Sequence, residues 1–263
     1  MISISDILQQ QYNSIQVELI RCRSNPYDAA RIHDLRVAIR TLRGLIKFLK
    51  KKLPQTAYED IDKNLSEAAK ILGPLRELDV LIAKSGKFAY NHPEKNTNYR
   101  QIFKSFHIKR DEELQKFLVS SIQQSLITYL IHVKTQLDAL DFNKKTDWSK
   151  YLSRELERRK VKLIKLYDDL DFKNYTLVHQ IRKKAKTLRY STTYFSKFLS
   201  KNDKKVNKKA RKIQSICGKI TDAHVNYNLL HHLAEQAENK HAKETLLRIA
   251  QAQRKIYISE GSN

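Results

Sequence analysis

The 263-residue sequence contains few residues that interrupt helices or form covalent links. Its five glycines and four prolines predict long helices joined by short connections. Its two cysteines, Cys22 and Cys217, form neither a disulfide framework nor a CxxC pair, which is typical of a reduced cytosolic protein. With 41% apolar residues, the chain can still bury a sizeable core.

Long apolar runs are also missing. A membrane-spanning helix needs about 20 apolar residues, whereas the best run, 126–133, is short and includes Thr128 and His132. The N-terminus, MISISDILQQ, lacks the charged start and apolar segment of a signal peptide. We therefore expect a soluble, cytoplasmic protein without a membrane partner.

Established catalytic and metal-binding motifs are absent: there is no P-loop, HExxH, GxSxG or acidic cluster for Mg²⁺. His33–Asp34 forms a single HD dipeptide without the further ligands that a metal-dependent phosphohydrolase needs. We expect His231, His232 and His241 on the surface rather than at a metal. The sequence thus predicts a protein that is not an enzyme and holds no metal or cofactor.

Acidic residues are outnumbered by basic ones, 28 against 51, which gives a net charge of +23. This excess indicates an anionic partner, such as nucleic acid, an acidic membrane surface or a phosphate polymer. A generic, lysine-rich solubilising surface is the alternative. The way the charge is clustered favours a partner.

Two histidine-led basic stripes, HDLRVAIRTLR and HQIRKKAKTLR, stand about 146 positions apart, at 33 and 179. Each places four residues at i, i+3, i+7 and i+10, which lie on one face of an α-helix, with apolar residues behind them. A solvated face explains one such stripe equally well, but duplication and arginine favour oxyanion binding. The first stripe comprises His33, Arg36, Arg40, Arg43 and, continuing it, Lys47; the second comprises His179, Arg182, Lys186 and Arg189.

The two leading histidines have two open roles: they donate to phosphate, or they are buried and bonded to a backbone carbonyl or to Glu77 and Asp222. These two acids are expected to orient arginines. Arg76, near a predicted helix start, is a further anion ligand. The run KNDKKVNKKARK adds Lys205, Lys208 and Lys212 on one helix face, either as a solvated face or as the rim of the anion site.

A second pattern repeats with the stripes. Gly73, Leu75 and Glu77 follow the first stripe as Gly218, Ile220 and Asp222 follow the second, which indicates an internal duplication. The predicted fold is all-α, with two helical bundles related by pseudo-twofold symmetry. We expect half one at 1–118, a connecting helix at 119–141 and half two at 142–263.

Helical periodicity extends along nearly the whole chain and is interrupted by two predicted loops, 91–97 and 141–148. The predicted helices run from Ser3 toward Cys22, from Pro26 to Leu53, over 56–72, from Gly73–Pro74 onward, and over 98–118, 120–140, 147–169, 175–199, 203–217, 219–237 and 240–258. Gly218 is expected to end a helix, as Gly73 does.

Four segments, RIHDLRVAIRTLRGLIKFLKKKL (31–53), LGPLRELDVL (72–81), VHQIRKKAKTLRY (178–190) and ICGKITDAHV (216–225), resemble the CHAD family, the conserved histidine α-helical domain. The resemblance covers essentially the whole chain. It implies two pseudosymmetric four-helix bundles around a central basic groove or pore. It also implies binding of inorganic polyphosphate and, for some members, a place on polyphosphate granules. Carried over by position, the binding residues are the two stripes together with Lys183.

Polyphosphate binding is therefore the leading hypothesis, because a linear polyphosphate reads alike from either end and suits a site with pseudo-twofold symmetry. Nucleic-acid binding is the alternative. Single-strand binders interleave aromatic residues with cations, and the stripe positions contain none; Tyr190 and Tyr194 are expected in the core. Weak, non-specific nucleic-acid binding is expected at low salt. An enzyme acting on phosphoanhydrides is the third hypothesis.

Overall fold

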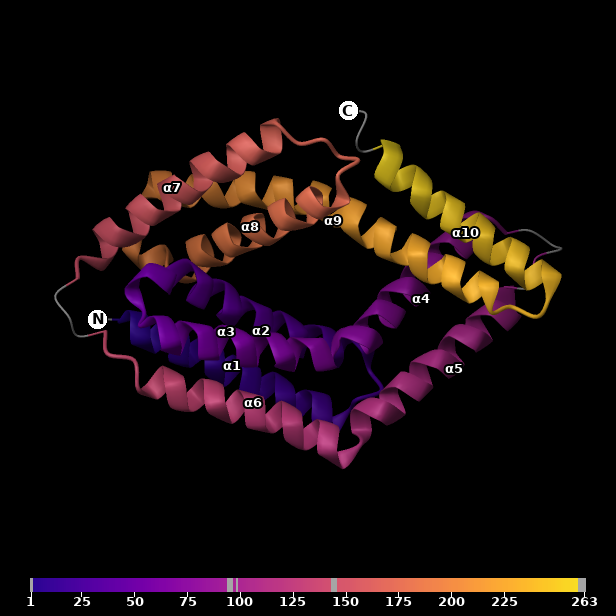
Figure 1. Ribbon diagram of the computed structural model, residues 1–263, viewed down its shortest axis with the longest axis horizontal. Helices are drawn as coiled ribbons and strands as arrows, with labels where there is room; N and C mark the ends of the chain where they lie inside the picture. Colours follow the sequence, from indigo (N-terminus) through magenta and orange to yellow (C-terminus); the bar gives the residue numbers. More distant parts are fainter. Residues whose placement is uncertain (1, 94–96, 98, 143–145, 260–263) are drawn as a thin grey trace.

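The computed structural model describes residues 2–93, 97, 99–142 and 146–259, and all regular secondary structure within these ranges is helical (Figure 1). The predicted all-α fold is thereby confirmed. The α-helices are α1 (Ile4–Ser24), α2 (Ala29–Leu49), α3 (Gln55–Ile71), α4 (Gly73–Asn91), α5 (Tyr99–Leu118), α6 (Ser120–Asp138), α7 (Trp148–Asp168), α8 (Tyr175–Tyr194), α9 (Lys201–Glu235) and α10 (Lys240–Ser259).

Side-chain caps set where α1 and α2 begin. Ser3 and Asp6 form a capping box at the start of α1, and the Asp28 carboxylate accepts a hydrogen bond from the Ala30 amide at the start of α2. The second helix therefore begins after Asp28, and the prediction that Pro26 lies in its first turn is wrong. Of the two predicted loops, residues 94–96 and 143–145 lie outside the described residues.

The prediction of a helix end at Gly218 is also wrong, because α9 continues through it from Lys201 to Glu235. A glycine inside a helix costs about 1 kcal/mol relative to alanine but keeps its backbone hydrogen bonds. At the equivalent place in half one, Gly73 is followed by Pro74, whose ring cannot continue the preceding helix. The proline, and not the glycine, separates α3 from α4.

The apolar core has two parts that cut across the two sequence halves. The larger part joins α1, α2, α3 and α6 to α7, α8 and the first half of α9. The smaller part lies at the right of Figure 1, where Leu81 of α4, Phe106 of α5, Leu230 of α9 and Ile249 of α10 meet. α6, the helix expected to connect the halves, packs against α3 and α1. No described helix is long and apolar enough to span a membrane.

The two stripe helices, α2 and α8, lie side by side (Figure 1). Their apolar backs are buried as predicted, with Ile39 and Leu42 of α2 and Ile181 and Ala185 of α8 all at 0% exposure. The helices come close at Gly44, where an added Cβ would lie 3.0 Å from the ring of Tyr190. A glycine at this position lets the two basic faces approach each other.

A buried ion pair joins α4 to α5. Nε of Arg110 lies 2.7 Å from Oδ1 of Asp79, and these side chains are 12% and 2% exposed. Asp79 precedes Leu81, which belongs to the smaller core, by two residues. The pair thus ties together two helices of the smaller core and holds α4, which carries Arg76 and Glu77.

Candidate functional site

Cations from α2, α4 and α8 come together where the two stripes face each other. Cations on one helix lower the pKa of cations on another. Together with burial, Arg40 of α2 lowers the pKa values of Lys183 and Lys186 on α8, and Arg182 of α8 lowers those of Arg36 and Arg40 on α2. We call this group the central cluster. It consists of Arg36, Arg40, Arg43 and Lys47 on α2, Arg76 on α4, and Arg182, Lys183 and Lys186 on α8.

Burial and mutual repulsion disfavour the charged forms of these groups. Burial, together with Arg40 and Arg182, lowers the pKa of Lys186 from 10.5 to about 6, and Asp222 only partly opposes this. Burial and the neighbouring Arg40 also lower the pKa of Arg36 to about 10. The Nε atom of Arg36 is buried and has no hydrogen-bond partner among the described residues. The free protein thus holds positive charge that its own groups leave largely uncompensated.

Carboxylates fix two of the arginines. Arg43 binds Asp62 of α3 through Nε at 2.6 Å and Nη2 at 3.2 Å, and Lys47 lies 3.4 Å from the same carboxylate. Burial would raise the pKa of Asp62, but the hydrogen bond and charge of Arg43, helped by Lys47, lower it. Sequence reasoning missed Asp62, which stands 19 positions from Arg43.

The acids expected to orient arginines behave differently from each other. Nη1 of Arg182 lies 2.9 Å from Oδ1 of Asp222 and also donates to the Thr221 hydroxyl, so that prediction is confirmed for Asp222. The charge of Glu77 raises the pKa of Arg36 and so partly opposes the effect of burial, but Glu77 forms no ion pair among the described residues. The arginine of α8 is therefore held more firmly than its counterpart on α2.

Both leading histidines border the central cluster and are partly buried. Burial and the neighbouring cations Lys183 and Arg182 lower the pKa of His179 to about 4, and burial and Arg76 lower that of His33. Nδ1 of His179 is buried without a hydrogen-bond partner among the described residues. Of the two open roles, the structural one finds no support, because neither imidazole bonds to a backbone carbonyl, Glu77 or Asp222 within the described ranges. With their lowered pKa values, the imidazoles are largely neutral near pH 7.

Four predicted site residues lie apart from the central cluster. The guanidinium of Arg189 lies 4.9 Å over the ring of Tyr190. Its charge partly opposes the rise in the pKa of Tyr194 that burial causes. Lys205, Lys208 and Lys212 are exposed on α9, and within the described ranges none pairs with a carboxylate or with the stripes. Their position fits the solvated face that was the alternative for this run.

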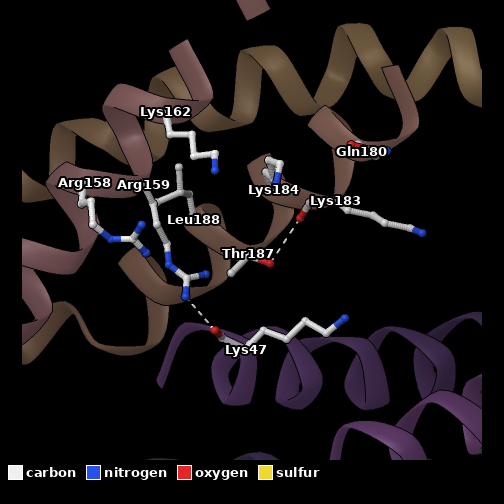
Figure 2. A pocket seen from close by; sticks show the side chains of 9 residues that line it. All are labelled: Lys47, Arg158, Arg159, Lys162, Gln180, Lys183, Lys184, Thr187 and Leu188. Carbon is white, nitrogen blue, oxygen red and sulfur yellow. Dashed lines mark hydrogen bonds between the residues drawn. The ribbon is translucent and has the colours of Figure 1, made fainter. Parts of the chain in front are cut away.

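A pocket of about 420 Å³ adjoins the central cluster between α7, α8 and the end of α2 (Figure 2). We call it the α7–α8 pocket. Sequence reasoning missed most of it, although the run ERRKVK places Arg158 and Lys162 one helical turn apart. It is lined by Lys47, Arg158, Arg159, Lys162, Gln180, Lys183, Lys184, Thr187 and Leu188.

The low pKa of Lys186 predicts how the stability of the free protein depends on pH. Its pKa is about 6 in the fold, against an ordinary value of 10.5, so between these values the unfolded chain binds more protons. Stability should therefore rise with pH across this window, by at most about 1.4 kcal/mol per pH unit for one group.

Urea unfolding at pH 7 and pH 9 measures this slope. Lys186→Met should make the slope smaller than in the unaltered protein. Lys87→Met, an exposed residue of α4 outside the cluster, is the control and should leave it unchanged. Equal slopes in all three proteins would show that the fold does not lower the pKa of Lys186.

The chemistry available to these residues is that of binding. Guanidinium and ammonium groups on adjoining helices offer many donors to oxyanions. Among the described residues, no group of three or more His, Cys, Asp or Glu side chains is placed to hold a metal ion. Both cysteines are buried, and burial raises the pKa of each thiol to about 11, which keeps them protonated.

Fold and site together define an all-helical protein with a cationic face built from two paired stripe helices. The CHAD domain family matches residues 6–231, and the chain belongs to this family. A search of curated proteins finds no significant match.

Two solved structures share the fold. The CHAD domain from the plant Ricinus communis is 22% identical with a TM-score of 0.70, over 95% of this chain and 84% of that one. PptA from Streptomyces chartreusis is 12% identical with a TM-score of 0.72, over 97% of this chain and 94% of that one. At these identities the likeness concerns the fold alone.

Proposed function

We propose that the protein binds inorganic polyphosphate through the central cluster and is not an enzyme. Membership of the CHAD family and the polyphosphate binding implied by that resemblance support this function. The proposal includes a cytoplasmic location and association with polyphosphate granules.

The observation that carries the proposal is the partly buried, uncompensated charge of Arg36 and Arg40, beside which burial and the same arginines lower the pKa of Lys186. Repulsion between these groups makes the free protein less stable, and a bound polyanion would remove that cost. Arg43 and Arg182 are already fixed by carboxylates, so their guanidinium groups lose little conformational entropy on binding. A chain with a negative charge on each phosphate can contact α2 and α8 together.

Nucleic acid fits the same cluster less well. Single-strand binders offer aromatic faces on which bases stack. Tyr190, which follows the second stripe and lies against Gly44 of α2, is 8% exposed. Tyr175 already stacks on His224, with the ring centres 3.7 Å apart. Nucleic acid should therefore bind through its backbone charge alone, weakly and at low salt.

Competition separates the two ligands. Long-chain polyphosphate bound to the protein at about 0.15 M salt, where backbone charge contacts are weakened, should resist an equal phosphate concentration of single-stranded RNA. Displacement by the RNA would contradict the proposal. Incubation with polyphosphate and Mg²⁺ or Mn²⁺ should leave the chain length unchanged, and shortening beyond that seen with an Arg36→Met, Arg40→Met variant would identify an enzyme instead.

A further inference from the structure

The α7–α8 pocket has the features of a binding site in its own right. Its volume of about 420 Å³ falls within the range of about 300–1,000 Å³ usual for small-molecule pockets. Six of its nine lining residues are lysine or arginine and none is acidic. Figure 2 shows that these side chains come from three helices: Arg158, Arg159 and Lys162 from α7, Lys183 and Lys184 from α8, and Lys47 from α2.

The wall formed by Arg159 is fixed in place. Its Nε lies 2.6 Å from Oε1 of Glu155, and its Nη2 donates to the backbone carbonyls of Lys47 at 2.7 Å and Phe48 at 3.3 Å. The guanidinium also lies 4.9 Å over the Phe48 ring. Within the described ranges, Nη1 of Arg159 has no protein partner, so its donors remain for a ligand.

Glu155 holds the arginines without cancelling the charge of the pocket. Its carboxylate is 5% exposed and also accepts two hydrogen bonds from Arg158, at 2.8 and 2.6 Å. Burial would raise the pKa of Glu155, but its hydrogen bonds to the two arginines lower it. One buried anion thus faces two arginines, and Lys162 and Lys184 add charge that no carboxylate in the pocket wall balances.

This pocket is distinct from the central cluster although the two adjoin. On α8, residue 184 stands two positions from residue 186, about 200° around the helix. Lys47 and Lys183 alone belong to both groups. Burial, with Lys162 and Arg159, lowers the pKa of Lys184, as expected for cations that converge without a counter-charge.

We propose that the α7–α8 pocket is a second anion site, which takes a compact group of several phosphates. Its small volume excludes a long extended chain, and its many fixed donors need a ligand with several charges. The Thr187 hydroxyl already donates to the Lys183 carbonyl at 3.2 Å, so its oxygen accepts further bonds from a protonated phosphate or a water. The group is either a free oligophosphate or the end of a longer chain.

Titration calorimetry with tripolyphosphate at about 0.15 M salt tests this site, and Lys162→Gln with Lys184→Gln is the variant. Both lysines are exposed, so the double variant should fold. We expect at least about tenfold weaker binding, because two charge-assisted contacts to the phosphates are lost. Lys87→Gln with Lys104→Gln removes the same charge from exposed positions of α4 and α5 and should stay within about twofold of the unaltered protein.

A site-specific readout comes from methyl NMR, where the Leu188 methyl resonances should shift as tripolyphosphate is added. Failure of tripolyphosphate to bind, or equal binding by the pocket variant and the control, would overturn the proposal. Loss of tripolyphosphate in Arg36→Met, Arg40→Met with retention in the pocket variant would place it in the central cluster and also overturn it.

The two sources of phosphate are distinguished by adding long-chain polyphosphate first. If the pocket takes chain ends, the polymer should prevent the Leu188 shift caused by tripolyphosphate. If it takes a free oligophosphate, the shift should persist while the polymer remains bound. Failure of the polyphosphate function would leave tripolyphosphate binding intact, so the two proposals can fail separately.

Discussion

Arg36→Met combined with Arg40→Met should weaken the binding of long-chain polyphosphate by about 100-fold or more. Two charge-assisted contacts worth about 1.5–3 kcal/mol each are lost, and 1.4 kcal/mol corresponds to a factor of ten. Methionine keeps an unbranched apolar stem of similar length, so packing against the core is largely retained. Calorimetric titration at about 0.15 M salt measures the effect.

The same variant should be more stable than the unaltered protein, by about 1 kcal/mol in urea unfolding. Arg36 and Arg40 are partly buried and form no ion pair among the described residues. Burial and Arg40 lower the pKa of Arg36, and burial and Arg182 lower that of Arg40. Removing them relieves repulsion that serves only the ligand, a trade between stability and function common at binding sites.

The matched control is Lys87→Met with Lys104→Met, which removes two charges from exposed positions outside the cluster. It should change polyphosphate affinity by less than about threefold, since distant exposed charges are largely screened at this salt. An equal loss of affinity in both double variants would mean that the total charge of the protein, and not the central cluster, binds the polymer.

Asp79→Ala should destabilise the fold by about 3–5 kcal/mol, because it leaves the charge of Arg110 buried without its partner. The effect should be large, since the Asp79 side chain is 2% exposed and that of Arg110 is 12% exposed. Urea unfolding followed by circular dichroism measures it.

A second substitution separates the lost ion pair from the lost volume. Asp79→Leu with Arg110→Met removes both charges and should recover most of the stability, because an apolar pair of similar size avoids the cost of burying ions. Asp138→Ala, in an exposed pair with Lys134, is the matched control and should change the stability far less than Asp79→Ala. A similar loss for Asp79→Ala and Asp138→Ala would contradict a structural role for the buried pair.

The stripes could be predicted because helical spacing is a local property of the chain. The positions of Arg36 and Arg40 relative to Ile39 and Leu42 determine which side chains are buried, whatever the helix packs against. The repeat then indicated that two such helices belong together, and α2 and α8 are indeed packed against each other.

Contacts between distant segments could not be predicted from spacing. Arg159 is 112 positions from Lys47, whose carbonyl it binds, and Asp79 is 31 positions from Arg110. Nothing local in ERRKVK distinguishes a pocket wall from a solvated face. The predicted helix end at Gly218 was wrong because the break at Gly73 was attributed to the glycine. The break depends on Pro74, and no proline follows Gly218, so α9 continues through it.

The most direct test of the central claim is a crystal structure of the protein with long-chain polyphosphate. The account predicts ordered phosphates within hydrogen-bonding distance of both Arg40 on α2 and Lys186 on α8, joined by one chain. Phosphates ordered only along the exposed face of Lys205, Lys208 and Lys212, with the central cluster empty, would contradict it.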